Sequence, residues 1–242
     1  MKILKNLFRW QPNRETFVAF LLGVVIIALS ILMPLFKHSI TMIVLIRDVL
    51  MVIGGIFFSI WYIHSKKYQF KDFGLSMRRW YIYLPINIVL GILLFFLFLE
   101  DYPDAKIVFN SNTIAKISYI MIAGVFETIV FYAFLRKIFE DAFGIISAIL
   151  LASIFYSFHH AGFQPEFLKL IFVGILYAGV FRVGNSALLI YPFFWGVGAC
   201  FDVLIQSEVV DEILYPGIRL IILLPLLIIG GFLMYRFHRR MF

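Results

Sequence analysis

The chain has 242 residues, of which 63% are hydrophobic and 14% charged, with a formal net charge of +7. Soluble domains average about 45–50% apolar residues and about 25% charged ones, so a soluble domain is excluded. The single cysteine, Cys200, excludes a disulfide scaffold, and 29 Phe with 12 Tyr exclude a disordered chain. Because the basic residues are spread over several short loops, we do not expect a nucleic-acid partner. We expect an all-α, polytopic helix bundle in the lipid bilayer, with residues 1–242 forming one domain.

Eight hydrophobic segments are long enough to predict membrane spans, each needing about 20 residues to cross about 30 Å of hydrocarbon. In chain order they cover residues 16–36, 41–63, 81–99, 114–139, 144–160, 168–182, 187–205 and 218–237. The fifth and sixth are short, so we expect neighbouring helices to shelter them. The first has no small-x-small cleavage site and is expected to remain as an anchor.

The distribution of basic residues predicts the orientation. With eight spans, both termini share one side of the membrane, and that side holds most of the basic residues: Lys2, Lys5, Arg9, Arg14, Lys66, Lys67, Lys71, Arg78, Arg79, Arg136, Lys137, Arg182, Arg236, Arg239 and Arg240. The opposite side holds Lys37, Lys106, Lys116, Lys169 and Arg219, together with the acidic residues Glu100, Asp101, Asp104, Glu166, Glu208, Asp211 and Glu212. Both termini are therefore predicted to be cytoplasmic.

Ionisable residues within spans are costly and tend to mark functional sites. The adjacent Arg47 and Asp48 are interpreted as a structural ion pair with neighbouring spans. Glu127, His159 and Asp202 lie at similar depths, about 18, 22 and 22 Å from the cytoplasmic ends of their helices at 1.5 Å per residue. They could face a common cavity, where an acid and an imidazole can activate a water molecule. The alternative is a buried polar cluster that only holds the helices together.

Several neighbouring residues could support such a site. Thr128 and Tyr132 are four residues apart and should share a helix face. Trp195 could form a wall of the site, and Gly198 permits close helix approach. His160 is a second candidate, although a rotation of about 100° per residue predicts that it points away from His159.

At these positions the chain resembles the CPBP family, the CAAX-prenyl-protease and bacteriocin-processing (Abi) intramembrane endopeptidases. That family carries Glu-Glu-x-x-Phe-Arg-Gly, then Phe-x-x-x-His, then His-x-x-x-Asn/Asp on successive motif helices. The corresponding segments read Glu-Thr-Ile-Val-Phe-Tyr-Ala from Glu127, Phe-Tyr-Ser-Phe-His up to His159, and Gly-Ala-Cys-Phe-Asp up to Asp202. The similarity covers about residues 70–205, including Phe73-Gly74-Leu75 and Phe143-Gly144.

The resemblance implies that Glu127 acts as general base with His159 as its partner, and that Asp202 occupies the place of an oxyanion donor. The chain also departs from the family: Thr128 replaces the second Glu, Tyr132 the Arg, and Gly198 the second His. Loss of an oxyanion donor typically costs about 100- to 1000-fold in rate. Tyr132, His160 or Trp195 are the candidates for a replacement hydrogen bond.

Three functional hypotheses follow. The first is a metal-independent intramembrane endopeptidase without a cofactor, which cleaves a membrane-associated protein or peptide in a prokaryotic cell membrane. The second is a catalytically inactive relative that serves as a membrane scaffold or as a regulator binding a partner protein. The third is a transporter or metal-binding protein that uses Glu127, His159, His160 and Asp202.

Overall fold

The computed structural model describes residues 6–162, 164, 166–206 and 213–240. Within them the chain is helical and contains no strand, which confirms the predicted all-α bundle. The elements are α2 (Arg14–Leu32), η1 (Met33–Phe36), α3 (Ile40–Ile43), η2 (Val44–Ile53), α4 (Gly54–Ser65), η3 (Phe70–Phe73), α5 (Trp80–Asp101), α6 (Ser111–Glu127), η4 (Thr128–Leu135), α7 (Arg136–Phe143), α8 (Ile145–Phe158), α9 (Phe167–Gly184), η5 (Ala187–Leu189), α10 (Phe193–Leu204) and α11 (Pro216–Arg240). Lys2, Lys5, Glu208, Asp211 and Glu212, which entered the orientation argument, lie outside the described residues.

Six helical segments in the described part of the chain are long and apolar enough to cross a membrane: Arg14–Phe36, Ile40–Ser65, Trp80–Asp101, Ser111–Phe143, Phe167–Gly184 and Pro216–Met234. Two shorter apolar helices, Ile145–Phe158 and Phe193–Leu204, complete a series that follows the order of the eight predicted spans. The protein is therefore an integral multi-pass membrane protein.

The lengths of two predicted spans require correction. The sixth, expected to be short, is the 18-residue helix α9, and the seventh is the 12-residue helix α10. The reason lies before α10, where residues 187–189 form a single 3₁₀ turn and Pro192, which has no backbone N–H, precedes the first helical residue. The α-helix of the seventh segment consequently begins six residues later than predicted.

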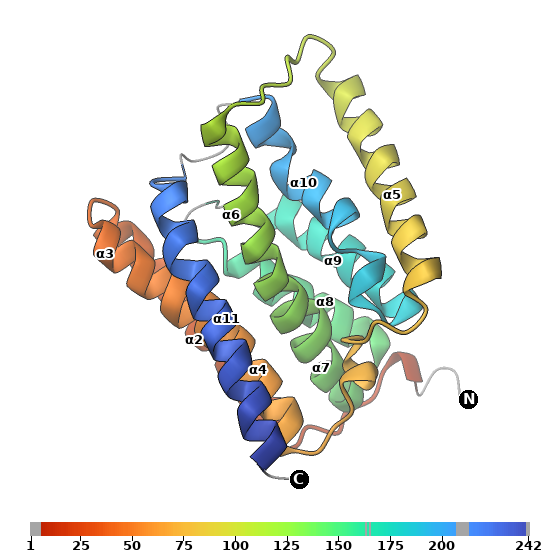
Figure 1. Ribbon diagram of the computed structural model, residues 1–242. Helices are drawn as coiled ribbons and strands as arrows, with labels where there is room; N and C mark the ends of the chain where they lie inside the picture. The colour runs from red at the N-terminus through yellow and green to blue at the C-terminus, as the bar shows by residue number, and fades with distance from the viewer. Residues whose placement is uncertain (1–5, 163, 165, 207–212, 241–242) are drawn as a thin grey trace.

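A continuous helix formed by α6, η4 and α7 runs through the middle of the bundle and positions the candidate site (Figure 1). It contacts α10 and α11 through α6, and α8 through α7. Every residue of η4 except Ile129 is buried. At the periphery, α5 and α11 present many exposed apolar side chains, as expected for helices in contact with lipid.

A π-helical segment, η4, follows Glu127 directly. π-helical turns are rare and often occur at functional sites. Because η4 replaces the α-helical hydrogen-bond pattern from Thr128 onward, it sets the direction of the side chains that follow Glu127.

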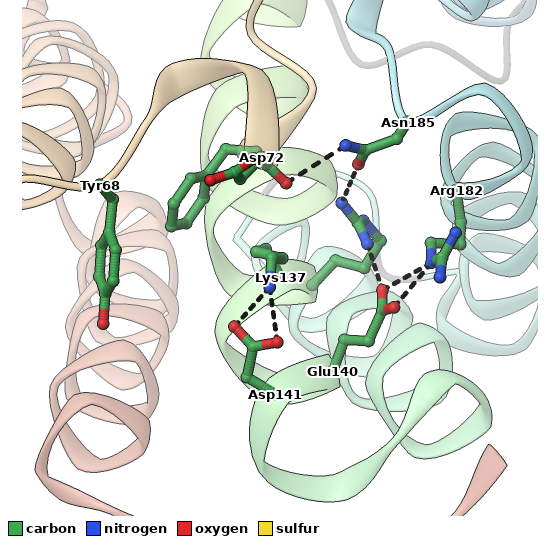
Figure 2. A pocket seen from close by; sticks show the side chains of 9 residues that line it. Tyr68, Asp72, Lys137, Glu140, Asp141, Arg182 and Asn185 are labelled. Carbon is green, nitrogen blue, oxygen red and sulfur yellow. Dashed lines mark hydrogen bonds and ion pairs between the residues drawn. The ribbon is translucent and has the colours of Figure 1, made fainter. Parts of the chain in front are cut away.

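The start of the described chain, before α2, and the C-terminal end of α11 lie at the same end of the bundle (Figure 1). A cleft of about 410 Å³ opens there between α7, α9 and the segment that carries Asp72. Glu140 pairs with Arg136 at 2.5 Å and with Arg182 at 2.7 Å, and Arg136 also donates to Oδ1 of Asn185 (Figure 2). This charged network is typical of a membrane–water boundary, and its basic residues are those that predict the cytoplasmic side.

Candidate functional site

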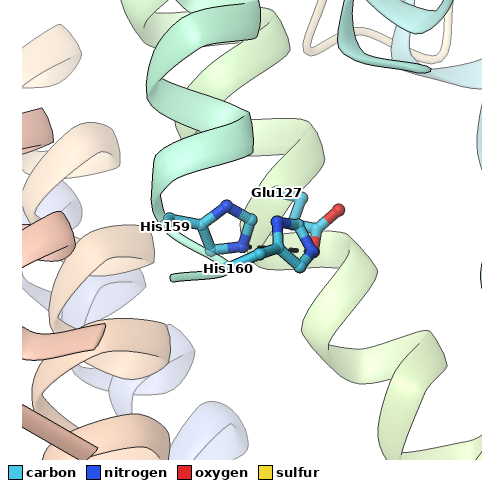
Figure 3. Close-up of side chains that lie close together, drawn as sticks. All are labelled: Glu127, His159 and His160. Carbon is cyan, nitrogen blue, oxygen red and sulfur yellow. Dashed lines mark ion pairs between the residues drawn. The ribbon is translucent and has the colours of Figure 1, made fainter. Parts of the chain in front are cut away.

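Glu127 lies at the junction of α6 and η4, near the middle of the helical segment Ser111–Phe143, and only 6% of its surface is exposed. Its Oε1 is 3.4 Å from Nε2 of His159 and 3.7 Å from Nε2 of His160 (Figure 3). The acid and the first imidazole predicted from the sequence are therefore neighbours. They come from two helices that are consecutive along the chain.

The structure corrects the expected direction of His160. The α-helix α8 ends at Phe158, so His159 is its C-cap and His160 lies in the following turn. The rotation of 100° per residue applies only within the helix. Both imidazoles consequently face Glu127, with ring centroids 3.9 Å apart (Figure 3).

One backbone carbonyl orients both imidazoles. Nδ1 of His160 lies 2.9 Å from the carbonyl oxygen of Tyr156, and Nδ1 of His159 contacts the same oxygen. If each Nδ1 carries the proton and donates it to this acceptor, each Nε2 is left with its lone pair directed toward Glu127. This contact could not be predicted from the sequence, because its acceptor is a backbone atom.

Aromatic rings fix the histidines from the sides. The ring of Phe131 lies 4.6 Å from that of His159, and the ring of Tyr156 lies 4.9 Å from that of His160, measured between centroids. Phe126 contacts His159 edge-on at 5.9 Å. The site is therefore a small polar cluster inside an aromatic core.

Trp195 binds the second oxygen of the carboxylate. Its indole Nε1–H donates to Oε2 of Glu127 at 3.0 Å. Gly124, one turn before Glu127, makes this approach possible, because a Cβ there would lie 2.2 Å from an atom of the indole ring. The expected wall residue is thus a direct hydrogen-bond partner of the acid.

The remaining motif positions contribute packing. The Thr128 side chain is buried, and its hydroxyl has no hydrogen-bond partner among the described residues. The ring of Tyr132 packs 5.5 Å from that of Tyr156 and 6.0 Å from that of Tyr177. Gly198 gives room to the Tyr177 hydroxyl, which would lie 2.0 Å from a Cβ at that position.

Asp202 does not join this cluster. Glu127, His159 and His160 offer ligand atoms within 4.8 Å of one another, and no such group in the described part of the chain contains Asp202. Asp202 follows Trp195 by seven residues, which is about two helical turns and about 10 Å along α10. Since Trp195 is the α10 residue that contacts Glu127, the depth estimate that aligned Asp202 with the acid does not hold.

A second buried polar cluster connects η2, α6 and α11. Asp48 accepts hydrogen bonds from Arg219 at 2.6 and 2.8 Å and from the Tyr119 hydroxyl at 2.7 Å. The Arg47 guanidinium lies 5.5 Å from the centre of the Tyr119 ring. The predicted ion pair with a neighbouring span therefore exists for Asp48, and its cation is Arg219 from the segment predicted as the eighth span.

Comparison of the chain with family models, curated proteins and solved structures gives no match. The resemblance to CPBP endopeptidases therefore rests on the motif residues. The contact between Glu127 and His159 brings together the two residues that the resemblance names as general base and partner.

Proposed function

We propose that the protein is an intramembrane endopeptidase that hydrolyses a peptide bond with a water molecule activated at Glu127 and His159. The observation that supports the proposal is the distance of 3.4 Å between Oε1 of Glu127 and Nε2 of His159, both buried in the helix bundle. A carboxylate and an imidazole this close to each other can act together, as general base and partner, on a water molecule that binds beside them.

The location of the site favours a membrane-associated protein or peptide as substrate. Glu127 lies near the centre of an apolar 33-residue helical segment, at a depth that a soluble substrate does not reach. Hydrolysis there requires a chain that is itself in the membrane or enters it. We place this activity in a prokaryotic cell membrane.

The test uses four single variants expressed in the native host. Glu127→Gln and His159→Gln remove the two reactive groups with little change in volume, and Glu100→Gln and His38→Gln are the matched controls at exposed positions. Membrane peptides are compared by mass spectrometry at equal expression and insertion. We expect at least one product to disappear in both site variants and to persist in both controls. An unchanged set of peptides in all four strains would refute the proposal.

A second candidate is a catalytically inactive regulator, favoured by a different observation. The Trp195 N–H already donates to Glu127 and is therefore not directed at an oxyanion. The Tyr177 hydroxyl fills the space beside Gly198, the position at which the family carries its second His. This function predicts that Glu127→Gln retains the biological phenotype and the binding of a partner protein. Loss of the phenotype with partner binding intact would exclude it.

A further inference from the structure

We infer that Glu127, His159 and His160 form a binding site for one divalent cation of the zinc type. All three side chains are buried, and they offer ligand atoms within 4.8 Å of one another (Figure 3). Two imidazole nitrogens and one carboxylate oxygen form a ligand set that zinc accepts, with a fourth position open to water.

Two of the three distances between the ligand atoms are compatible with tetrahedral coordination. At zinc–ligand bonds of about 2.0–2.2 Å, two ligands of a tetrahedron lie about 3.3–3.5 Å apart, whereas adjacent ligands of an octahedron lie only about 2.8–3.1 Å apart. The distances from Oε1 to the two Nε2 atoms are 3.4 and 3.7 Å. They are close to the tetrahedral value and exceed the octahedral one.

The surroundings of the three ligands provide a second, independent argument. Ligating histidines usually donate their other ring N–H to a carbonyl or a carboxylate, which fixes the tautomer and the ring orientation. Here the Tyr156 carbonyl lies against Nδ1 of both histidines. Ligating carboxylates are hydrogen-bonded in turn, and Oε2 of Glu127 accepts from Trp195 while Oε1 faces the histidines. The outer contacts of a metal site are therefore in place for all three ligands.

This inference departs from the metal-independent mechanism expected from the sequence. It rests on the proposed function only for the use of the bound water in peptide hydrolysis: with Glu127 and His159 as ligands, the ion would take over from these two groups the activation of that water. The site itself follows from the positions of the ligands. It also assigns a function to His160, which the motif comparison left without a defined role.

The experiment measures metal binding directly, on the full chain in detergent or nanodiscs. Wild type, Glu127→Gln, His160→Gln and the control His38→Gln are stripped with a chelator, dialysed against Zn²⁺ or Co²⁺, and analysed by elemental mass spectrometry. We expect about one ion per chain for wild type and His38→Gln, and at least a tenfold loss for the two site variants. Bound Co²⁺ should show the intense visible absorption of a tetrahedral site.

Thermal unfolding controls for misfolding. Zn²⁺ should raise the Tm of wild type and His38→Gln, because a ligand that binds only the folded state stabilises it, and should leave the Tm of a folded His160→Gln unchanged. Wild type that binds no stoichiometric metal and shows no Zn²⁺-dependent shift overturns the inference, even if metal-free protein still cleaves its substrate. Stoichiometric metal at these ligands supports it, even if no cleavage product is found.

Discussion

The indole N–H of Trp195 donates to Oε2 of Glu127 at 3.0 Å and connects α10 to α6 within the bundle. Trp195 therefore determines how the carboxylate is turned, because it occupies the oxygen that does not face the histidines. This contact makes the position of the acid dependent on a helix that lies 68 residues later in the chain.

Trp195→Phe should remove this hydrogen bond while keeping most of the ring. We expect a loss of about 1 kcal/mol in stability, because a buried acceptor loses its donor. Formation of any cleavage product should also slow, since the carboxylate can rotate. Thermal unfolding and product formation measure the two effects, with Trp61→Phe, at a 54% exposed position, as the control. Equal behaviour of the two variants would show that the indole N–H has no role.

Gly124→Ala should displace the Trp195 ring. The added Cβ would lie 2.2–2.6 Å from three ring atoms, so the indole must move and its N–H can no longer reach Glu127 in the same geometry. Gly179→Ala in α9 is the matched control, because a Cβ there meets nothing within 4 Å. We expect Gly124→Ala to destabilise the protein and Gly179→Ala to stabilise it by about 0.5–1 kcal/mol, as alanine favours helix. Thermal unfolding of both variants measures the two effects. Equal changes in the unfolding free energy of Gly124→Ala and Gly179→Ala would contradict the prediction.

Gly198→Ala and Tyr177→Phe should compensate each other. A Cβ at position 198 would lie 2.0 Å from the Tyr177 hydroxyl oxygen, and removal of that oxygen leaves the ring carbon as the nearest atom at 3.3 Å. We therefore expect Gly198→Ala alone to be clearly destabilising, and much less so in the Tyr177→Phe background. A double-mutant cycle by thermal unfolding measures this coupling, and strictly additive effects would contradict it.

Asp48→Leu should be strongly destabilising, because it leaves Arg219 buried without its carboxylate. The two side chains are 0% and 2% exposed, and breaking one partner of a buried pair costs about 3–5 kcal/mol. Asp48→Leu combined with Arg219→Met should recover much of this loss. Glu166→Gln removes the exposed ion pair with Lys169, whose charged atoms are 3.2 Å apart. We expect this variant to lose less than about 1 kcal/mol of unfolding free energy. Equal losses in unfolding free energy for Asp48→Leu and Glu166→Gln would contradict the stabilising role given to the buried pair of Asp48 and Arg219.

The predicted orientation can be tested by cysteine labelling in a Cys200→Ala background. Arg78→Cys and Lys106→Cys place single thiols at exposed positions on the two predicted sides. A membrane-impermeant maleimide added to intact cells should label Lys106→Cys only, and should label both variants after the cells are opened. Labelling of Arg78→Cys in intact cells would show that the protein has the opposite orientation to the one predicted.

The helical membrane fold could be predicted from the sequence alone, and so could the choice of Glu127 and His159 as ionisable residues at similar depths. The fold follows from local properties, whereas the similar depths left open whether the two side chains meet. Long apolar segments must form helices to satisfy their backbone groups in lipid, and a buried acid or imidazole requires a polar partner. The order of the apolar segments was predicted correctly for the same reason.

The other side chains that reach the acid could be identified only from the folded bundle. His160 turns toward Glu127 because α8 ends one residue before His159, and Asp202 lies about two helical turns beyond Trp195, the α10 residue that contacts Glu127. Trp195 reaches Glu127 because Gly124 lacks a side chain, and Arg219 reaches Asp48 from a helix at the far end of the chain. These features depend on helix ends and on packing between distant segments, which spacing along the sequence does not encode.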